Sequence, residues 1–258
     1  MKTDLKKCTV FITGASAGIG EACAREFARA GSRLIITARR HSKLKELARE
    51  LEKQYATQIL ALKLDVRDSI AVDQLITDLP NEFKNIDVLV NNAGLVLGME
   101  QIHETPKPDV DVMIDTNVKG VVNLIRAIVP QMEAVNHGHV INISSIAGLE
   151  AYPGGGIYCA TKHAVAAITK SLRMDLVATD LRVSAISPGM VNTEFSTIRF
   201  KGDVDKANSV YDGLEAMVAK DIAEAVVYVA ASPTHVQIAD MVILANKQAS
   251  ATVVHRDL

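Results

Sequence analysis

A serine, a tyrosine and a lysine in the middle of the chain have the spacing of an acid–base centre. Tyr158 and Lys162 stand four residues apart, and Ser145 precedes the tyrosine by thirteen residues. On a helix, residues at this spacing share one face, so the Lys162 ammonium can approach the Tyr158 phenol and lower its pKa from about 10. Such a phenol can donate or accept a substrate proton, and Ser145 can bind the reacting oxygen. A tyrosine and lysine at this spacing also occur together by chance, so the expectation depends on the motifs around them.

A glycine-rich segment near the N-terminus has the pattern of a dinucleotide-binding turn. Residues 13–20 read TGASAGIG, follow a short apolar run and precede a helical pattern. Glycines permit a tight turn, and a helix N-terminus offers free N–H groups and partial positive charge to a pyrophosphate. The alternative is a glycine-rich connection without a ligand. The strand before the segment and the helix after it favour the binding turn.

The second predicted strand ends at a pair of arginines. Arg39 and Arg40 stand where dinucleotide-binding proteins that use NAD usually have an acidic residue for the adenosine ribose. A guanidinium can pair with the 2′-phosphate of NADP, whereas a carboxylate would repel it. The sequence therefore favours NADP over NAD. The alternative is that either arginine only begins a solvated helix face beside His41 and Lys43.

Polar residues also follow the third and fourth predicted strands. Asp65, before Val66, can accept a hydrogen bond from an adenine amino group, and the small residues after Asn92 let the backbone run close to a ribose. Either polar residue can instead cap a helix or form a turn, as Asp and Asn commonly do.

Short β-branched runs alternate with longer helix-periodic runs along the whole chain. The predicted strands are residues 8–12, 33–37, 59–64, 86–91, 139–144, 182–186 and 241–244, and their nearly continuous apolar character is typical of buried parallel strands. The predicted helices are residues 21–30, 42–55, 69–79, 117–133, 158–179 and 221–231. This alternation predicts an α/β protein, a doubly wound Rossmann fold with a seven-stranded parallel sheet flanked by helices on both faces.

Length and composition favour a single domain over residues 1–258. The net charge of −2 provides no basic surface for nucleic acid. Cys8, Cys23 and Cys159 form no closely spaced pair, so neither a disulfide framework nor a metal site is indicated. We find no signal peptide and no run of about 20 apolar residues, and we therefore expect a cytoplasmic protein that does not enter a membrane.

Together these motifs resemble those of the short-chain dehydrogenase/reductase family, from Val10 to about Leu244. The matching patterns are TGxxxGIG at 13–20, NNAG at 91–94, the asparagine Asn117, the serine Ser145, YxxxK at 158–162 and PGxxxT at 188–193. The resemblance implies that Tyr158 exchanges the proton, that Ser145 orients the carbonyl, that Lys162 also binds the nicotinamide ribose, and that Asn117 anchors a water leading to Lys162. It implies an NADP site made by Gly14, Ala15, Ser16, Ala17, Gly18, Ile19, Arg39, Arg40, Asp65, Val66, Asn92, Tyr158, Lys162, Pro188, Gly189, Val191 and Thr193.

A narrower likeness concerns the substrate. Residues 91–100, 113–117 and 193–203 resemble those of the NADP-dependent 3-hydroxy acid dehydrogenases, a branch that acts on serine, allo-threonine, 3-hydroxyisobutyrate and similar acids or reduces malonic semialdehyde. Arg199 is the candidate cation for the substrate carboxylate, and an ion pair with Glu194 or Asp203 is its alternative role. Residues 190–215 are expected to form a substrate loop or lid, and residues 246–258 a short tail.

Two other functions stay open at this point. A 3-oxoacyl carrier-protein reductase would perform the same chemistry on a larger substrate. An NADP sensor without catalysis is more remote, because it has no reason to keep Ser145, Tyr158 and Lys162 together. The family also implies a homotetramer built through the long helices on either side of the fifth strand.

Overall fold

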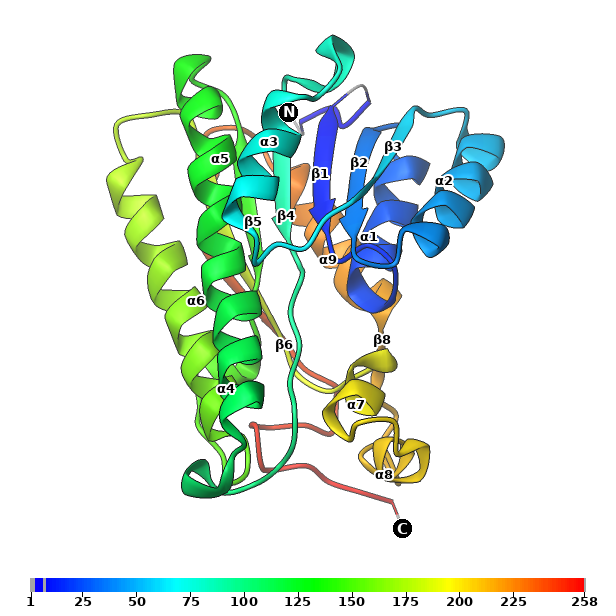
Figure 1. Cartoon of the computed structure of the whole chain (residues 1–258), viewed down its shortest axis with the longest axis vertical. Helices are drawn as coiled ribbons and strands as arrows, with labels where there is room; N and C mark the ends of the chain where they lie inside the picture. The colour runs from blue at the N-terminus through cyan, green and yellow to red at the C-terminus, as the bar shows by residue number, and fades with distance from the viewer. Residues whose placement is uncertain (1–2, 7, 258) are drawn as a thin grey trace.

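The computed structural model describes residues 3–6 and 8–257, and a parallel sheet of seven strands forms its centre (Figure 1). The strand order is β3-β2-β1-β4-β5-β6-β9, and every neighbouring pair is parallel. The strands are β1 (Thr9–Thr13), β2 (Arg33–Ala38), β3 (Ile59–Lys63), β4 (Val88–Asn91), β5 (His139–Ile143), β6 (Arg182–Pro188) and β9 (Asp240–Ile243). Strands β1 to β3 are added toward one edge of the sheet, and the strands from β4 onward are added toward the other edge. In such folds this change between β1 and β4 opens a crevice for ligands. The predicted seven-stranded Rossmann architecture is confirmed.

Helices cover both faces of the sheet, so alternate side chains of each strand enter two separate cores. Val10 and Ile12 pack in one core, whereas Phe11 packs in the other. Figure 1 shows the two helical layers: one contains α1 (Gly18–Arg29), α2 (His41–Tyr55) and α9 (Ala219–Ala230), and the other contains α3 (Ser69–Thr77), α5 (Gly120–Ala134) and α6 (Gly156–Asp175).

Three short α-helices among the described residues were not predicted. They are α4 (Lys107–Ile114), α7 (Glu194–Arg199) and α8 (Val204–Ser209). Each has only six to eight residues, which is too short for a helical hydrophobic pattern to stand out. The predicted helix 117–133 differs too, because a π-helical turn over Asp115–Lys119 joins α4 to α5. A two-residue pairing of β7 (Val191–Asn192) with β8 (Met217–Val218) closes the loop that contains α7 and α8.

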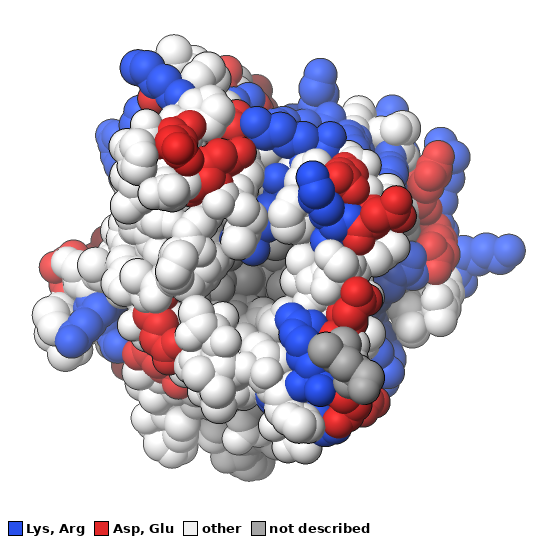
Figure 2. Space-filling view, turned by 90° about the horizontal axis from the view of Figure 1, so that it is seen from below, with Lys and Arg blue, Asp and Glu red and all other residues white. Residues whose placement is uncertain are grey.

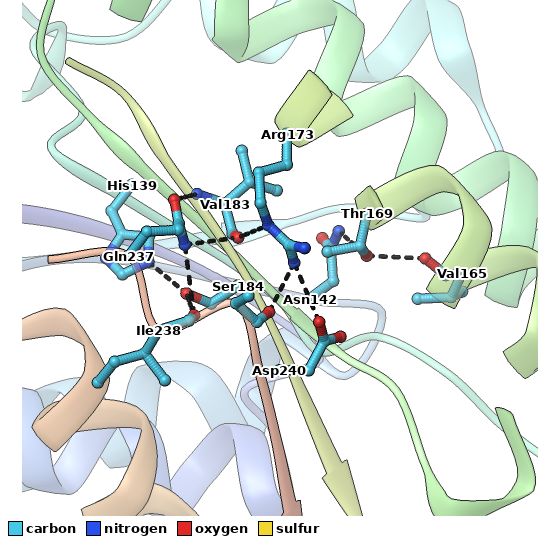
Figure 3. A network of polar contacts seen from close by, with 11 residues as sticks. His139, Asn142, Val165, Thr169, Arg173, Val183, Ser184, Gln237, Ile238 and Asp240 are labelled. Atoms are coloured by element: carbon cyan, nitrogen blue, oxygen red, sulfur yellow. Dashed lines mark hydrogen bonds and ion pairs between the residues drawn. The ribbon is translucent and has the colours of Figure 1, made fainter. Parts of the chain in front are cut away.

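A network of polar side chains holds β5, β6 and the chain before β9 together, away from the ligand crevice (Figure 3). The Ser184 hydroxyl donates to the carbonyl of Ile238 at 2.6 Å and lies 2.8 Å from Nε2 of His139. Because Ser184 gives its hydroxyl proton to the Ile238 carbonyl, it can only accept from His139. His139 therefore carries its proton on Nε2, and its Nδ1 carries none. That Nδ1 atom is buried with no hydrogen-bond partner in the described part of the chain. Burial, together with the charge of Arg182, lowers the pKa of His139 well below its usual value.

Across residues 3–6 and 8–257, no helix has the length and apolar character to span a membrane. The same residues contain no cluster of three His, Cys, Asp or Glu side chains arranged for a metal ion.

Candidate active site

A cavity of about 800 Å³ opens at the carboxyl ends of the strands. Figure 2 looks onto this face and shows the hollow near its centre. Every predicted site residue lines the cavity except Ala15 and Asn117. Ala15 is fully buried, and its N–H donates to the Thr37 carbonyl at 3.1 Å. The strand ends thus gather almost all of the predicted residues around one space.

The glycine-rich turn leaves backbone N–H groups free at the start of α1. Ala17 precedes the helix and provides no side-chain cap, so the first N–H groups of α1 can bind an anion. Gly14 has φ +68°, which strains other residues. A Cβ at Gly20 would lie 2.4 Å from Nδ2 of Asn92, which donates to the Thr13 carbonyl at 2.9 Å. Asn92 therefore fixes the shape of the turn from the neighbouring strand.

The two arginines after β2 have different surroundings. Arg40 donates from Nε to the Ser16 hydroxyl at 3.1 Å and from Nη1 to the Glu194 carboxylate at 2.8 Å. Lys43 also reaches Glu194, at 3.2 Å. Arg39 is exposed at the edge of the cavity. Arg39 is thus presented to the cavity, while Arg40 connects the glycine-rich turn to α7.

Asp65 and Val66 border the cavity beyond the arginines. The Asp65 carboxylate accepts from the Arg67 guanidinium at 2.6 Å, and this contact lowers the pKa of Asp65. The Val66 carbonyl accepts from Asn123 of α5 at 2.9 Å. The carboxylate is therefore ionised and fixed beside the position expected for an adenine.

Tyr158, Lys162 and Ser145 meet at the inner end of the cavity, and all three are buried. The Lys162 ammonium donates to the Ile143 carbonyl at 2.9 Å and lies 5.8 Å from the centre of the Tyr158 ring. Burial raises the pKa of Tyr158, although Ser145 and Arg199 act in the opposite direction. Burial also lowers the pKa of Lys162 to about 8. The phenol is therefore protonated at neutral pH, and Lys162 is not among the groups that lower its pKa.

Asn117 lies behind this centre, on the π-helical turn. Its side chain accepts from the Leu95 N–H at 2.9 Å and donates to the Leu95 carbonyl at 2.8 Å. It also donates to the Thr161 hydroxyl at 3.0 Å. A Cβ at Gly94 would lie 3.3 Å from Asn117 Oδ1 and 3.7 Å from Lys162 Nζ, so both side chains border the space beside this glycine. Asn117 thereby ties the loop after β4 to α6.

Arg199 reaches the centre from the end of α7. Its Nη2 donates to the Tyr152 hydroxyl at 2.5 Å, and its guanidinium lies 5.8 Å from the ring centres of both Tyr152 and Tyr158. Its Nε atom is buried without a hydrogen-bond partner in the described part of the chain. Glu194 pairs instead with Arg40 and Lys43. The alternative role of Arg199, an ion pair with Glu194 or Asp203, is therefore not what the structure shows.

Comparison with known proteins identifies the family. A profile of the short chain dehydrogenases matches residues 8–203. The chain belongs to the short-chain dehydrogenase family. It is 43% identical over 249 residues to an NADP-dependent 3-hydroxy acid dehydrogenase of Schizosaccharomyces pombe, covering 96% of each chain. It is 45% identical to the NADP-dependent 3-hydroxy acid dehydrogenase YdfG of Escherichia coli K12, over 96% of this chain and 99% of that one. A solved structure of a serine dehydrogenase in its closed form with NADP⁺ overlays with a TM-score of 0.91, at 45% identity over 96% of this chain and all of the other. The predicted family resemblance is confirmed.

This short-chain dehydrogenase also has cavity residues to which the sequence assigned no role. Phe195 packs edge-on against Tyr158, with ring centres 5.6 Å apart. Tyr152 folds over a glycine, since a Cβ at Gly155 would lie 2.1 Å from its ring. Further lining residues include Met99, Tyr211, Gln248 and the tail residues Ala251, Thr252, Val254 and Arg256. The Pro-Gly-Gly-Gly sequence after Tyr152 could have indicated the position of this tyrosine, because such a segment permits a close turn.

Proposed function

We propose that this protein is an NADP-dependent oxidoreductase that transfers a hydride between NADP(H) and the 3-hydroxy or 3-oxo carbon of a small hydroxy acid. The observation that carries the proposal is one cavity that holds both a buried Ser145–Tyr158–Lys162 centre and the guanidinium of Arg199. The relatives named as NADP-dependent 3-hydroxy acid dehydrogenases, which match nearly the whole chain, support it.

The residues present fit a dinucleotide with a 2′-phosphate. The uncapped start of α1 and the glycine turn suit a pyrophosphate, and Arg39 and Arg40 suit the extra phosphate. Asp65 and Val66 would border the adenine. The nicotinamide end would be bordered by Pro188, Gly189, Val191 and Thr193. When bound, the nicotinamide ring supplies or accepts the hydride.

Tyr158 acts as the proton donor when a carbonyl is reduced. Its raised pKa keeps the phenol protonated at neutral pH, so a proton is available for the developing alkoxide. Ser145 lies in the same buried pocket, and its hydroxyl, which donates to the Pro188 carbonyl at 3.4 Å in the structure, would donate to the same substrate oxygen instead. In the oxidation direction Tyr158 must first lose its proton, so alkaline conditions favour that direction.

Lys162 and Asn117 support this centre. Lys162 keeps one ammonium hydrogen on the Ile143 carbonyl and would offer the others to the ribose hydroxyls of a bound cofactor. Asn117 positions Lys162 indirectly, because its contacts with Leu95 and Thr161 fix the loop and the helix on either side of the lysine. The water between Asn117 and Lys162 that the family resemblance implies is part of the proposal.

Arg199 provides the charge that recognises the acid. Its Nε atom, which is buried without a hydrogen-bond partner among residues 3–6 and 8–257, and the Tyr152 hydroxyl beside Nη2 can donate to one carboxylate. The guanidinium lies 5.8 Å from the Tyr158 ring centre, which suits a substrate whose acid group and reacting carbon are only a few bonds apart. Residues 190–215, which carry Arg199 and Phe195, act as a lid over this substrate.

A substrate panel tests the proposal. Oxidation of serine, allo-threonine, 3-hydroxyisobutyrate and 3-hydroxypropionate is followed through formation of reduced cofactor, with NADP⁺ and NAD⁺ in parallel. Reduction of a 3-oxoacyl thioester by NADPH, followed through consumption of NADPH, is the comparison. We expect at least one of the acids with NADP⁺ to give the highest kcat/KM. A preference for the thioester would overturn the assignment in favour of a carrier-protein reductase. The single domain, the cytoplasmic location and the homotetramer stay predictions from the sequence.

A further inference from the structure

Two cations contact one carboxylate at the adenosine end of the cavity, and a third cation is adjacent in the sequence. Arg40 and Lys43 contact the two oxygens of Glu194, at 2.8 and 3.2 Å, and Arg39 lies next to Arg40 along the chain. Glu194 is the first residue of α7. The ion pairs therefore join the end of β2 to the segment 190–215, which is far away in the sequence.

Arg40 also ties this cluster to the glycine-rich turn. Its Nε donates to the Ser16 hydroxyl at 3.1 Å and its Nη2 to the Ser16 carbonyl at 3.4 Å, while Nη1 holds Glu194. One guanidinium thus bridges the turn that faces a pyrophosphate and the helix that carries Phe195 and Arg199. Any ligand that orders Arg40 also acts on the position of α7.

The charges of the cluster match a phosphate monoester. Arg39, Arg40 and Lys43 carry three positive charges and Glu194 one negative charge, which leaves two positive charges. A phosphate monoester carries about −1.5 to −2 at pH 7. The 2′-phosphate of NADP would therefore neutralise the cluster, whereas the plain ribose of NAD would leave its two positive charges uncompensated.

The ion pairs are weak enough to open. The side chains of Arg40, Lys43 and Glu194 are 44%, 48% and 47% exposed, and ion pairs at such positions are screened by water and salt. Closing α7 nevertheless has consequences at the reacting centre. Phe195, the next residue, packs on Tyr158, and Arg199, one helical turn further, reaches Tyr152.

We propose that Glu194 is a specificity-determining residue that latches residues 190–215 over the cavity when the 2′-phosphate of NADP orders Arg40 and Lys43. The Glu194 carboxylate contacts Arg40 and Lys43 and acts through them, so it is a positioning residue. This inference rests on the proposed function. It implies that NADP is preferred over NAD partly because only NADP lets the substrate site close.

Hydrogen–deuterium exchange of peptides covering residues 195–210 tests the latch in the full chain. Exchange is measured without cofactor, with saturating NADP⁺ and with saturating NAD⁺. We expect NADP⁺ to slow exchange in the native protein by about three- to tenfold more than NAD⁺, the factor that two screened ion pairs supply. In Glu194→Gln this difference should disappear, and because the coupling is reciprocal, NADPH affinity from fluorescence titration should fall by no more than the same factor. Glu215→Gln, an exposed position in the same part of the chain, is the matched control and should behave like the native protein.

A charge series at one position separates the latch from a general effect on folding. Glu194→Lys places a third cation beside Arg40 and Lys43 and should lose the protection by NADP⁺, whereas Glu194→Asp keeps the negative charge and should retain part of it. Unchanged protection in Glu194→Gln would overturn the latch. Tighter NADPH binding with stronger protection in Glu194→Gln would also overturn it, because Glu194 would then compete with the phosphate. If the native protein binds no NADP⁺, the cofactor assignment fails and the latch fails with it. If it binds NADP⁺ but Glu194→Gln changes nothing, only the latch fails.

Discussion

Removing the guanidinium of Arg199 should discriminate between acid and neutral substrates. In the structure this side chain is held beside Tyr152 and Tyr158, and its Nε atom is buried without a partner among the described residues. Arg199→Ala deletes these donors. It leaves the main-chain contact of Arg199, whose carbonyl accepts from the Gly98 N–H at 2.9 Å.

The size of the effect follows from the type of contact. Hydrogen bonds to charged groups contribute about 1.5 to 3 kcal/mol, or about 10- to 150-fold in kcat/KM. We expect a loss of this size for the best acid substrate and almost none for an uncharged analogue of similar size. Tyr152→Phe keeps the ring over Gly155 and removes one neutral donor, so its loss on the acid should be smaller.

Steady-state kinetics at saturating cofactor provides the comparison. Lys206→Ala removes a cation of the same segment whose side chain is 71% exposed and pairs with Asp203, and it should leave the preference for acids unchanged. Equal losses on the acid and on its uncharged analogue in Arg199→Ala would refute the reasoning, because the substitution would then have disturbed the segment rather than a carboxylate contact.

Three further substitutions test other parts of the account. Arg39→Asp should shift the ratio of kcat/KM from NADP towards NAD by at least about tenfold, because a carboxylate repels the 2′-phosphate; an unchanged ratio would leave the role to Arg40. Burial lowers the pKa of Lys162 to about 8, so NADPH affinity in fluorescence titrations should fall as the pH rises through that value, and Lys162→Met should bind more weakly at neutral pH without this dependence. His139 has a lowered pKa in the folded state, so its stabilising contribution is present above the unfolded pKa of about 6.5 and is lost by about 1.4 kcal/mol per pH unit below it. Urea denaturation should therefore show a shallower loss of stability in acid for His139→Gln, and parallel curves would contradict that assignment.

The sheet could be predicted because its strands are buried on both faces. Val10, Phe11 and Ile12 are all fully buried although they face different cores, so the strand is a continuous apolar run that a sequence displays directly. The helices α7 and α8 have six residues each, and tertiary contacts and caps determine them. Thr193 accepts from the Phe195 N–H at 3.3 Å at the start of α7, a local contact that no hydrophobic periodicity reveals.

Site residues could be predicted where they directly follow a strand or begin a helix. Contacts between side chains from distant segments of the chain could not be predicted. Ser145 and Tyr158 follow from motifs at the end of β5 and the start of α6. The pairing of Arg40 with Glu194 joins positions 154 residues apart, which spacing along the chain cannot indicate. The direction of the Tyr158 pKa shift also depends on burial beneath Phe195 and beside Tyr152. The spacing of Tyr158 and Lys162 in the sequence therefore did not predict that the pKa is raised.

Tyr158→Phe tests the central claim most directly, because it removes the transferable proton and keeps the ring against Phe195. Turnover of the best hydroxy acid with NADP⁺ and NADPH affinity by fluorescence are measured on the same preparation. Positioned acid–base groups contribute about 10² to 10⁴ in rate, so turnover should fall by that factor while NADPH affinity stays nearly unchanged. A variant that keeps more than about a tenth of the native activity would contradict the assignment of Tyr158 as the acid–base residue.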